Sequence, residues 1–391
     1  MRWLNFLHCY QPVNAESHII KEATERSYLR LIRALEEHPQ IKFTLNITGC
    51  LFLRWDDLGY KDIAPRLKRL LEKGNLELTG SAAYHPFLPL IPEKEVRRQI
   101  KENEEILKKY LGANWRGRGF FFPEGAYSPK IAQIVKEFGY EWTVLDEITR
   151  NGRLHQLSLD DFDCVYQDKN SGLKVVFRSR KFSKCYVPEF IKKMVKRDRD
   201  KDNLYITVTD GELYGLRHID HTAEFEKLLD NKYLKTMTFS EFVDAHSDFR
   251  SVALVASNWE SREDELIADK PYALWYDKDN DIQQMLWQLA RLAYRITEAN
   301  QQDKNYQWAR WHLVRGLASC TFWWASAKDF RLFGPISWSP DEIERGVNEL
   351  VRALRALDSE TTRAAKLAAE RLSIKIKKII WERHWREYWK K

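Results

Sequence analysis

The chain has 391 residues, with 64 Lys or Arg against 57 Asp or Glu and a net charge of +7. Basic and acidic residues are interleaved along its length, even in Ile191–Asp202, which argues against a nucleic-acid-binding protein. No apolar run approaches the ~18 residues that a membrane span needs, and the N-terminus lacks the features of a signal peptide. Five widely spaced cysteines argue against a disulfide framework or a zinc knuckle. We therefore expect a cytoplasmic protein with no membrane or nucleic-acid partner.

The first 250 residues alternate short apolar runs with amphipathic segments. The expected strands are Trp3–Leu7, Phe43–Ile47, Leu76–Thr79, Phe120–Phe122, Trp142–Leu145, Cys164–Tyr166, Lys174–Arg178 and Leu204–Thr209. The expected helices are Glu22–Glu37, Ile63–Lys73 with Gly74 as its C-cap, Glu93–Leu111, Pro129–Phe138, Pro188–Lys196 and Thr222–Asp230. Repeated strand–helix units with short connections predict a parallel sheet, and this many predict a closed or nearly closed barrel.

The pattern changes near residue 260, beyond which strand signals vanish. Helices are expected at Ile282–Asn300, Gln307–Ala327, Pro340–Leu357 and Ser359–Trp389. We therefore predict a barrel domain over residues 1–255 and a helical domain over residues 256–391.

Polar side chains follow the predicted strands, where the loops of a parallel barrel converge. The first strand is followed by His8 and Gln11, and the second offers Asn46 and Thr48 at its end. The third carries Glu77 and Thr79 and is followed by His85. Glu124 follows the fourth strand, and Asp210, Glu212 and His218 follow Leu204–Thr209. Each has a simpler explanation, since His8 suits a hydrogen-bonded core position and Asp210-Gly211 suits a turn. Taken singly, none defines a reaction.

Their joint pattern is more specific. Four segments occur in the order FLHCYQPVN, GNLELTGSAAYHPFLPLIP, GFFFPEGAYSP and TVTDGELYGLRH, and together they closely resemble the motifs of glycoside hydrolase family 57. The resemblance continues at Asn258-Trp259-Glu260 and at Thr321–Ser326. It implies a (β/α)7-type distorted barrel, a helical C-terminal domain that completes the active-site cleft, a retaining mechanism on α-glucans, and neither metal nor cofactor.

The same resemblance assigns roles to individual residues. Glu124, in Pro-Glu-Gly-Ala-Tyr, corresponds to the nucleophile, and Asp210, in Asp-Gly-Glu, to the general acid/base. The residues expected to contact an oligo- or polysaccharide are His8, Tyr10, Gln11, Glu77, His85, Glu212, His218, Trp259, Trp323 and Trp324, the three tryptophans by stacking on sugar rings. Tyr10 stands where the family usually has a second histidine, so we expect altered sugar contacts there.

Several activities stay open at this stage. Hydrolysis of the amylase type, 4-α-glucan transfer, branching and α-galactosidase activity are all compatible with the motifs, and the length favours action on linear α-glucan. A metal-dependent polysaccharide deacetylase would need an aspartate and two histidines around a divalent cation. A sugar-binding relative without turnover is the third alternative. The sequence does not predict the oligomeric state.

Overall fold

The computed structural model describes residues 1–326 and 338–388, and the chain divides into two compact units. The first unit comprises Met1–Ala83 and Leu88–Ile267, and the second comprises Tyr84–Phe87 and Ala268–Lys391. Within the described part of the chain, no helix combines the length and the apolar character that crossing a membrane requires.

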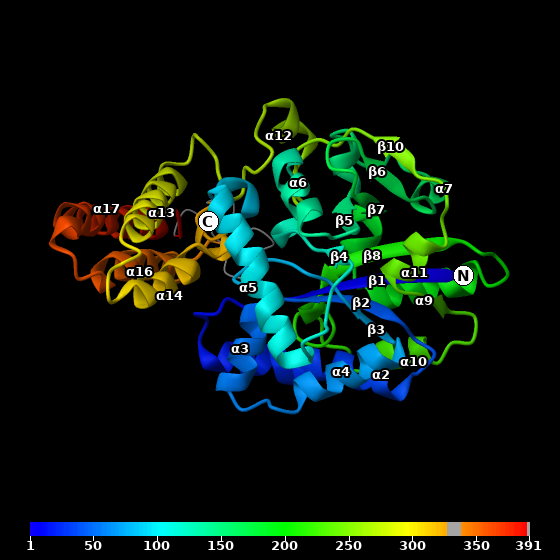
Figure 1. Cartoon of the computed structure of the whole chain (residues 1–391). Coiled ribbons are helices and arrows are strands. Elements are labelled where there is room, and N and C mark those ends of the chain that lie inside the picture. Colours follow the sequence, from blue (N-terminus) through cyan, green and yellow to red (C-terminus); the bar gives the residue numbers. More distant parts are fainter. Residues whose placement is uncertain (327–337, 389–391) are drawn as a thin grey trace. The chain divides into compact units, whose positions relative to one another are not determined.

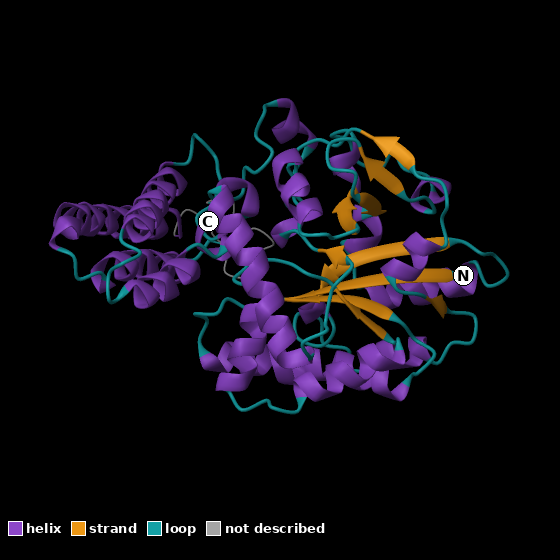
Figure 2. Cartoon of the chain, in the orientation of Figure 1, coloured by secondary structure: helices purple, strands orange, loops and turns teal. Residues whose placement is uncertain are grey.

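The first unit is built on seven parallel strands, counted over its described residues. They are β1 (Arg2–Cys9), β2 (Phe43–Ile47), β3 (Leu76–Leu78), β4 (Gly119–Phe120), β5 (Trp142–Asp146), β7 (Lys174–Arg178) and β8 (Leu204–Asp210). Hydrogen bonding orders them β3-β2-β1-β8 and β7-β5-β4, and a parallel bridge between Gly80 and Phe120 joins the two sheets. Between β7 and β8 the Arg178 guanidinium donates to the Val208 carbonyl at 2.7 Å. The result is a distorted (β/α)7-type barrel (Figure 2).

Three short strands lie outside this barrel. The strand β6 (Tyr166–Asp168) runs antiparallel to β7, β10 (Arg250–Val252) pairs with β6, and β9 (Lys235–Thr236) pairs with the start of β1. These additions extend two barrel strands sideways and leave the carboxyl ends of the strands accessible to loops.

Helices cover the outside of the barrel, and α2 and α4 lie beside β1–β3 in Figure 1. The helices of this unit are α1 (Ser17–Ala23), α2 (Leu29–Glu37), α3 (Gly49–Asp57), α4 (Ile63–Lys73), α5 (Glu93–Leu111), α6 (Pro129–Glu137), α7 (Leu159–Phe162), α8 (Arg180–Ser183), α9 (Val187–Arg197), α10 (Glu224–Leu229), α11 (Phe239–Asp244) and α12 (Glu263–Ile267). Apolar residues at helical spacing face the strands, as Ile63, Leu67 and Leu70 do in α4.

The described residues of the second unit form helices joined by loops and no strand, with one isolated β-bridge between Pro86 and Ala318 (Figure 2). This unit contains α13 (Asp281–Ala299), α14 (Tyr306–Gly316), α15 (Ser319–Trp323), α16 (Pro340–Ala356) and α17 (Arg363–Tyr388). Its core includes Trp287, whose ring stacks on that of Phe322 with centroids 3.8 Å apart. The short segment Tyr84–Phe87 belongs to this core, because Phe87 packs 4.8 Å from Trp275.

Many predicted elements agree with the structure. Phe43–Ile47, Ile63–Lys73, Glu93–Leu111 and Lys174–Arg178 have the predicted bounds, and Gly74 ends α4 in a left-handed conformation with φ of 74°. Their strong periodicity and terminal signals identify them locally.

Other elements differ from the prediction. The helix expected at Glu22–Glu37 begins at Ser17 and contains a π-helical turn, η1 (Thr24–Tyr28). The helix expected at Gln307–Ala327 is broken, because Ala318 leaves the helical conformation and pairs with Pro86. The ends at Ala327 and Trp389 lie outside the described residues.

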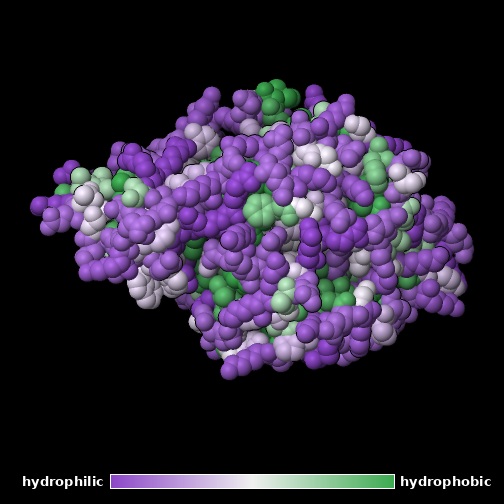
Figure 3. All heavy atoms as spheres, viewed as in Figure 1, coloured by the Kyte–Doolittle hydropathy of each residue, from purple (hydrophilic) through white to green (hydrophobic). Residues whose placement is uncertain are grey.

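The surface carries small separate hydrophobic groups on the face drawn in Figure 3. One lies over α12, where Ile267 is 73% exposed. The rest of this face is largely hydrophilic, in keeping with the interleaved charges of the sequence.

Candidate active site

His8 lies at the centre of the strand ends and is almost fully buried. Its Nδ1 contacts Asn46 Oδ1 at 2.9 Å, and its ring stacks on Phe121 with centroids 4.7 Å apart. Burial lowers the pKa of His8 to about 4, against an opposing effect of the nearby Asp210 carboxylate. His8 is therefore neutral near pH 7 and can offer hydrogen bonds but no positive charge.

Asp210 is the last residue of β8 and lies directly opposite His8 in the β1–β8 register. Its carboxylate is about a quarter exposed and forms an ion pair with Arg217, with Oδ2 and Nη1 2.8 Å apart. Asp210 is the main cause that raises the pKa of the Arg217 guanidinium. The position combines an accessible carboxylate with an arginine seven residues later, which the sequence prediction did not include.

Glu212 occupies a different environment, although only two residues away. Its carboxyl group is buried and accepts hydrogen bonds from Gln11 Nε2 at 2.7 Å and from the Tyr28 hydroxyl at 2.5 Å. Burial raises the pKa of Glu212 to about 7, with Arg217 opposing the rise. These contacts hold Glu212 beneath the site surface rather than towards solvent.

The π-helical turn η1 supplies one of those donors. It directs Tyr28 to Glu212 and Ser27 to the Gly211 carbonyl, the latter at 2.6 Å. A π-turn widens the helix by one residue and is often found at functional sites. Here it brings two consecutive side chains onto the loop that follows Asp210.

Glu124 sits in a 3-10 turn, η3 (Pro123–Gly125), just after β4, and is half-buried. Its φ of 61° and ψ of 19° place a non-glycine residue in the left-handed region, which costs about 1–3 kcal/mol. Its carbonyl accepts from the Trp259 backbone N–H at 3.3 Å. Beside it, a Cβ on Gly125 would lie 3.2 Å from Cβ of Trp259, so the turn and the Trp259 segment fit closely.

Trp259 joins the Glu124 turn to the centre of the site. Its ring lies 6.0 Å from that of His8 and 5.8 Å from that of Phe121. The Arg178 guanidinium lies 5.2 Å from the Trp259 ring centroid and donates to the Trp259 carbonyl at 3.1 Å. Arg178 and its partner Asp146 were not among the predicted residues, although both end strands that are mainly apolar.

Glu77 is not brought to this group of residues. It pairs with Thr44 in the β2–β3 register, two positions before Asn46, and accepts from Thr44 Oγ1 at 2.9 Å. It also accepts hydrogen bonds from the backbone N–H and hydroxyl of Ser240 at the start of α11. Burial raises the pKa of Glu77. These hydrogen bonds attach α11 to the barrel, two strand positions before the level of His8.

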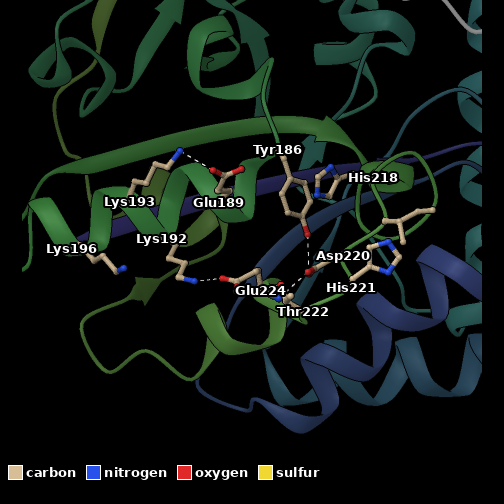
Figure 4. Close-up of a pocket in the computed structure, with 11 residues that line it drawn as sticks. Tyr186, Glu189, Lys192, Lys193, Lys196, His218, Asp220, His221, Thr222 and Glu224 are labelled. Carbon is tan, nitrogen blue, oxygen red and sulfur yellow. Dashed lines mark hydrogen bonds and ion pairs between the residues drawn. The ribbon is translucent and has the colours of Figure 1, made fainter.

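His218 lines a pocket of about 520 Å³ on the first unit (Figure 4). Its ring stacks on Tyr186 with centroids 3.6 Å apart, and the Tyr186 hydroxyl donates to Asp220 at 3.0 Å. The opposite wall is α9, with Lys192 paired to Glu224. The structure thus assigns His218 to a polar pocket on the loop that follows Asp210.

The other predicted contact residues fall in two places. Tyr10 is half-buried just after β1, with its ring 5.9 Å from that of His8. His85 belongs to the second unit, where it is buried and its Nδ1 contacts Ser319 Oγ at 3.0 Å. Trp323 and Trp324 also belong to the second unit, with ring centroids 4.6 Å apart.

Over residues 1–326 and 338–388, no three His, Cys, Asp or Glu side chains are grouped as metal ligands would be.

Comparison with known proteins gives a family and several relatives. The model of glycosyl hydrolase family 57 matches residues 2–256. The α-amylase of Pyrococcus horikoshii is 27% identical over 273 residues, which are 64% of this chain and 41% of that protein. The 4-alpha-glucanotransferase of Thermococcus litoralis is 25% identical over 286 residues, 67% of this chain and 42% of that protein. The chain thus spans about two-fifths of the length of these relatives.

Solved structures share the fold. The 4-alpha-glucanotransferase from Thermococcus litoralis superposes with a TM-score of 0.71 at 18% identity, over 92% of this chain and 60% of that one. A branching enzyme from Thermococcus kodakaraensis also has a TM-score of 0.71, at 14% identity, over 91% and 90% of the two chains.

Proposed function

Because the chain belongs to glycosyl hydrolase family 57, we propose that it acts on α-linked glucans by double displacement, with Glu124 as nucleophile and Asp210 as general acid/base. Glu124 attacks the anomeric carbon while Asp210 gives its proton to the departing oxygen. Asp210 then activates water, which gives hydrolysis, or a sugar hydroxyl, which gives transfer. The named relatives act in both ways, as an α-amylase and a 4-alpha-glucanotransferase.

One observation carries the proposal: His8 borders both segments that hold the carboxylates. It lies opposite Asp210 in the strand register and stacks on Phe121, three residues before Glu124. A retaining mechanism needs the two carboxyl groups ~5–5.5 Å apart, and two segments that flank one imidazole suit that requirement.

The ion pair between Arg217 and Asp210 must be broken before Asp210 can act as the acid in the first step. Asp210 can donate a proton to a leaving group only after it has left Arg217, taken up a proton from solvent and formed a hydrogen bond to the glycosidic oxygen. Arg217 is more than half exposed and is free to turn towards solvent when a sugar enters. Tyr10 and Trp259 are the proposed sugar contacts beside His8.

The test is incubation with maltooligosaccharides, followed by product size and anomeric configuration. Products shorter than the substrate indicate hydrolysis, and products both shorter and longer indicate transfer. We expect Glu124→Gln and Asp210→Asn each to lower turnover by about three orders of magnitude or more, while the fold is kept. Glu72→Gln, whose side chain is 63% exposed, is the matched control and should act as wild type.

A second substrate separates the two roles. A nitrophenyl maltooligoside has a leaving group that departs without protonation, so Asp210→Asn should retain far more of its glycosyl-enzyme formation than Glu124→Gln. A variant with near wild-type rates on both substrates loses its assigned role.

The family match favours this function over a metal-dependent deacetylase. A sugar-binding relative without turnover would bind maltooligosaccharides and release no product over long incubation, and that result would replace the enzymatic proposal.

A further inference from the structure

Two buried arginines share one carboxylate at the ends of neighbouring strands. Asp146, at the end of β5, is the register partner of Arg178, at the end of β7, and Arg180 follows two residues later. Asp146 lies 2.7 Å from Arg178 Nε and 2.7 Å from Arg180 Nη2, and at most 6% of each side chain is exposed. Burying two cations on one anion costs desolvation free energy, so stability alone is a weak reason for this cluster.

The remaining donors of Arg178 connect two parts of the candidate site. Its Nη1 donates to the Val208 carbonyl at 2.7 Å, two residues before Asp210 on β8. Its Nη2 donates to the Trp259 carbonyl at 3.1 Å, and the Trp259 N–H in turn donates to the Glu124 carbonyl. One planar side chain therefore contacts the strand of Asp210 and the neighbour of Glu124.

Both connected parts depend on outside support. Glu124 has a left-handed backbone that persists only where its surroundings hold it, and the Trp259 segment is packed against that turn. The strand β8 is held to β7 through the Arg178–Val208 contact and to α8 through Ser183 Oγ, which accepts from the Val208 N–H at 3.1 Å. A change at Arg178 would loosen both at once.

We infer that Arg178 is a positioning residue that sets the separation of the two catalytic carboxylates, acting through Val208 on Asp210 and through Trp259 on Glu124. This inference rests on the proposed function. A guanidinium suits the task because its rigid fork fixes several acceptors at once, whereas an ammonium group would fix them loosely.

Arg180 supplies a matched control, because it shares the carboxylate and the burial of Arg178 but not its two connections. Its Nη1 donates to the Ser261 carbonyl at 2.7 Å, and its backbone N–H donates to Glu147. Because Ser261 is hydrogen-bonded to Asn258 in the turn that carries Trp259, Arg180 also supports that turn. Comparing Arg178→Met with Arg180→Met therefore separates the loss of a buried charge, and of some support for this turn, from the loss of the direct Val208 and Trp259 contacts.

The experiment measures kcat and KM on maltooligosaccharides, with thermal unfolding of the same samples. We expect Arg178→Met to lower kcat by about 100-fold with KM within about threefold, because small misplacements of reacting groups cost rate rather than binding. Arg180→Met should lose about tenfold less in kcat at a similar loss of stability. Arg178→Lys should recover part of the rate, and added ethylguanidinium, but not ethylammonium, should recover part of it in Arg178→Ala.

The inference is overturned if both methionine variants lose kcat in proportion to stability, or if KM rises while kcat stays. Where Arg178→Met does not fold, Arg178→Lys and the rescue of Arg178→Ala decide: wild-type kcat in the lysine variant, or equal rescue by both cations, overturns it as well. Failure of the proposed function looks different, since wild type itself would then release no product, or Glu124→Gln and Asp210→Asn would keep full activity.

Discussion

Glu212 and Asp210 are two residues apart, and their surroundings assign them different electrostatic tasks. Asp210 is accessible and paired with Arg217, whereas Glu212 is buried beneath Gln11 and Tyr28. Since burial disfavours a charged carboxyl group, Glu212 keeps its proton to higher pH than it would in the unfolded chain.

This difference predicts how stability varies with pH. The pKa of Glu212 rises from 4.5 to about 7 on folding, which corresponds to about 3 kcal/mol. Below pH 4.5 both states are protonated and no penalty exists. Between pH 4.5 and 7 the unfolded chain releases its proton first, so the folded state loses stability as pH rises, and above pH 7 the loss is complete.

We therefore expect Glu212→Gln to gain stability relative to wild type as pH rises through this window. Urea unfolding of both proteins at pH 4.5, 6 and 8 measures the difference. A difference that is the same at all three pH values would contradict the assignment of this titration to Glu212. Glu77→Gln is the comparison for a second, half-buried carboxyl group away from the site, whose pKa burial also raises.

At the scale of elements, the turn η3 shows how backbone conformation and packing combine. Gly74 and Gly125 both have left-handed backbones, with φ of 74° and 57°. A Cβ on Gly74 would meet no atom within 4 Å, while one on Gly125 would meet Trp259 at 3.2 Å. An alanine would therefore strain the backbone at both positions, but only at Gly125 would its Cβ press on a neighbouring residue.

We expect Gly74→Ala and Gly125→Ala each to cost about 1 kcal/mol or more of stability from strain. Only Gly125→Ala should also reduce turnover, by about tenfold or more, because it pushes on the segment that supports Glu124. Unfolding curves and initial rates on maltooligosaccharides check both statements. Equal activity in the two variants would show that the fit between η3 and Trp259 has no part in turnover.

The elements also show where sequence patterns are sufficient and where they fail. Glu93–Leu111 has five turns of amphipathic periodicity, so its bounds follow from local information. The break between α14 and α15 arises from the pairing of Ala318 with Pro86, a contact across more than 200 residues that no local pattern contains. The two-residue strand β9 is too short to carry any alternation.

Sequence patterns likewise identify some residues of the candidate site and miss others. His8, Glu124 and Asp210 stand at strand ends in recognisable motifs, so the sequence marks them. Arg178 and Asp146 end the mainly apolar strands KVVFR and WTVLD, and a search for charged residues that close such strands would have found them. Their pairing depends on β5 and β7 being neighbours, which the order along the chain does not reveal.

At the scale of the whole molecule, the two units have separate cores, and each can be perturbed by itself. Phe322 stacks on Trp287 in the helical unit, and Phe239 stacks on Trp142 in the barrel unit. Both phenylalanines are fully buried. Truncating either to alanine removes a comparable amount of packing, at a cost of about 3–5 kcal/mol.

We expect Phe322→Ala to speed amide hydrogen exchange mainly in α13–α17, and Phe239→Ala to speed it mainly in the barrel strands. Exchange followed by mass spectrometry of peptides measures both patterns. If each variant speeds exchange equally in both units, the two units open as one cooperative body.

The placement of Tyr84–Phe87 in the helical unit makes the chain's division discontinuous. During synthesis Phe87 leaves the ribosome almost two hundred residues before Trp275, and His85 leaves it 234 residues before Ser319, the groups against which these two side chains are buried. A nascent barrel therefore carries an unsatisfied apolar loop until Trp275 and Ser319 have been synthesised, and a chain cut after Ile267 would carry it permanently. When the barrel is expressed alone, the loop Tyr84–Phe87 should be replaced by polar residues, because its exposed apolar side chains would otherwise promote aggregation.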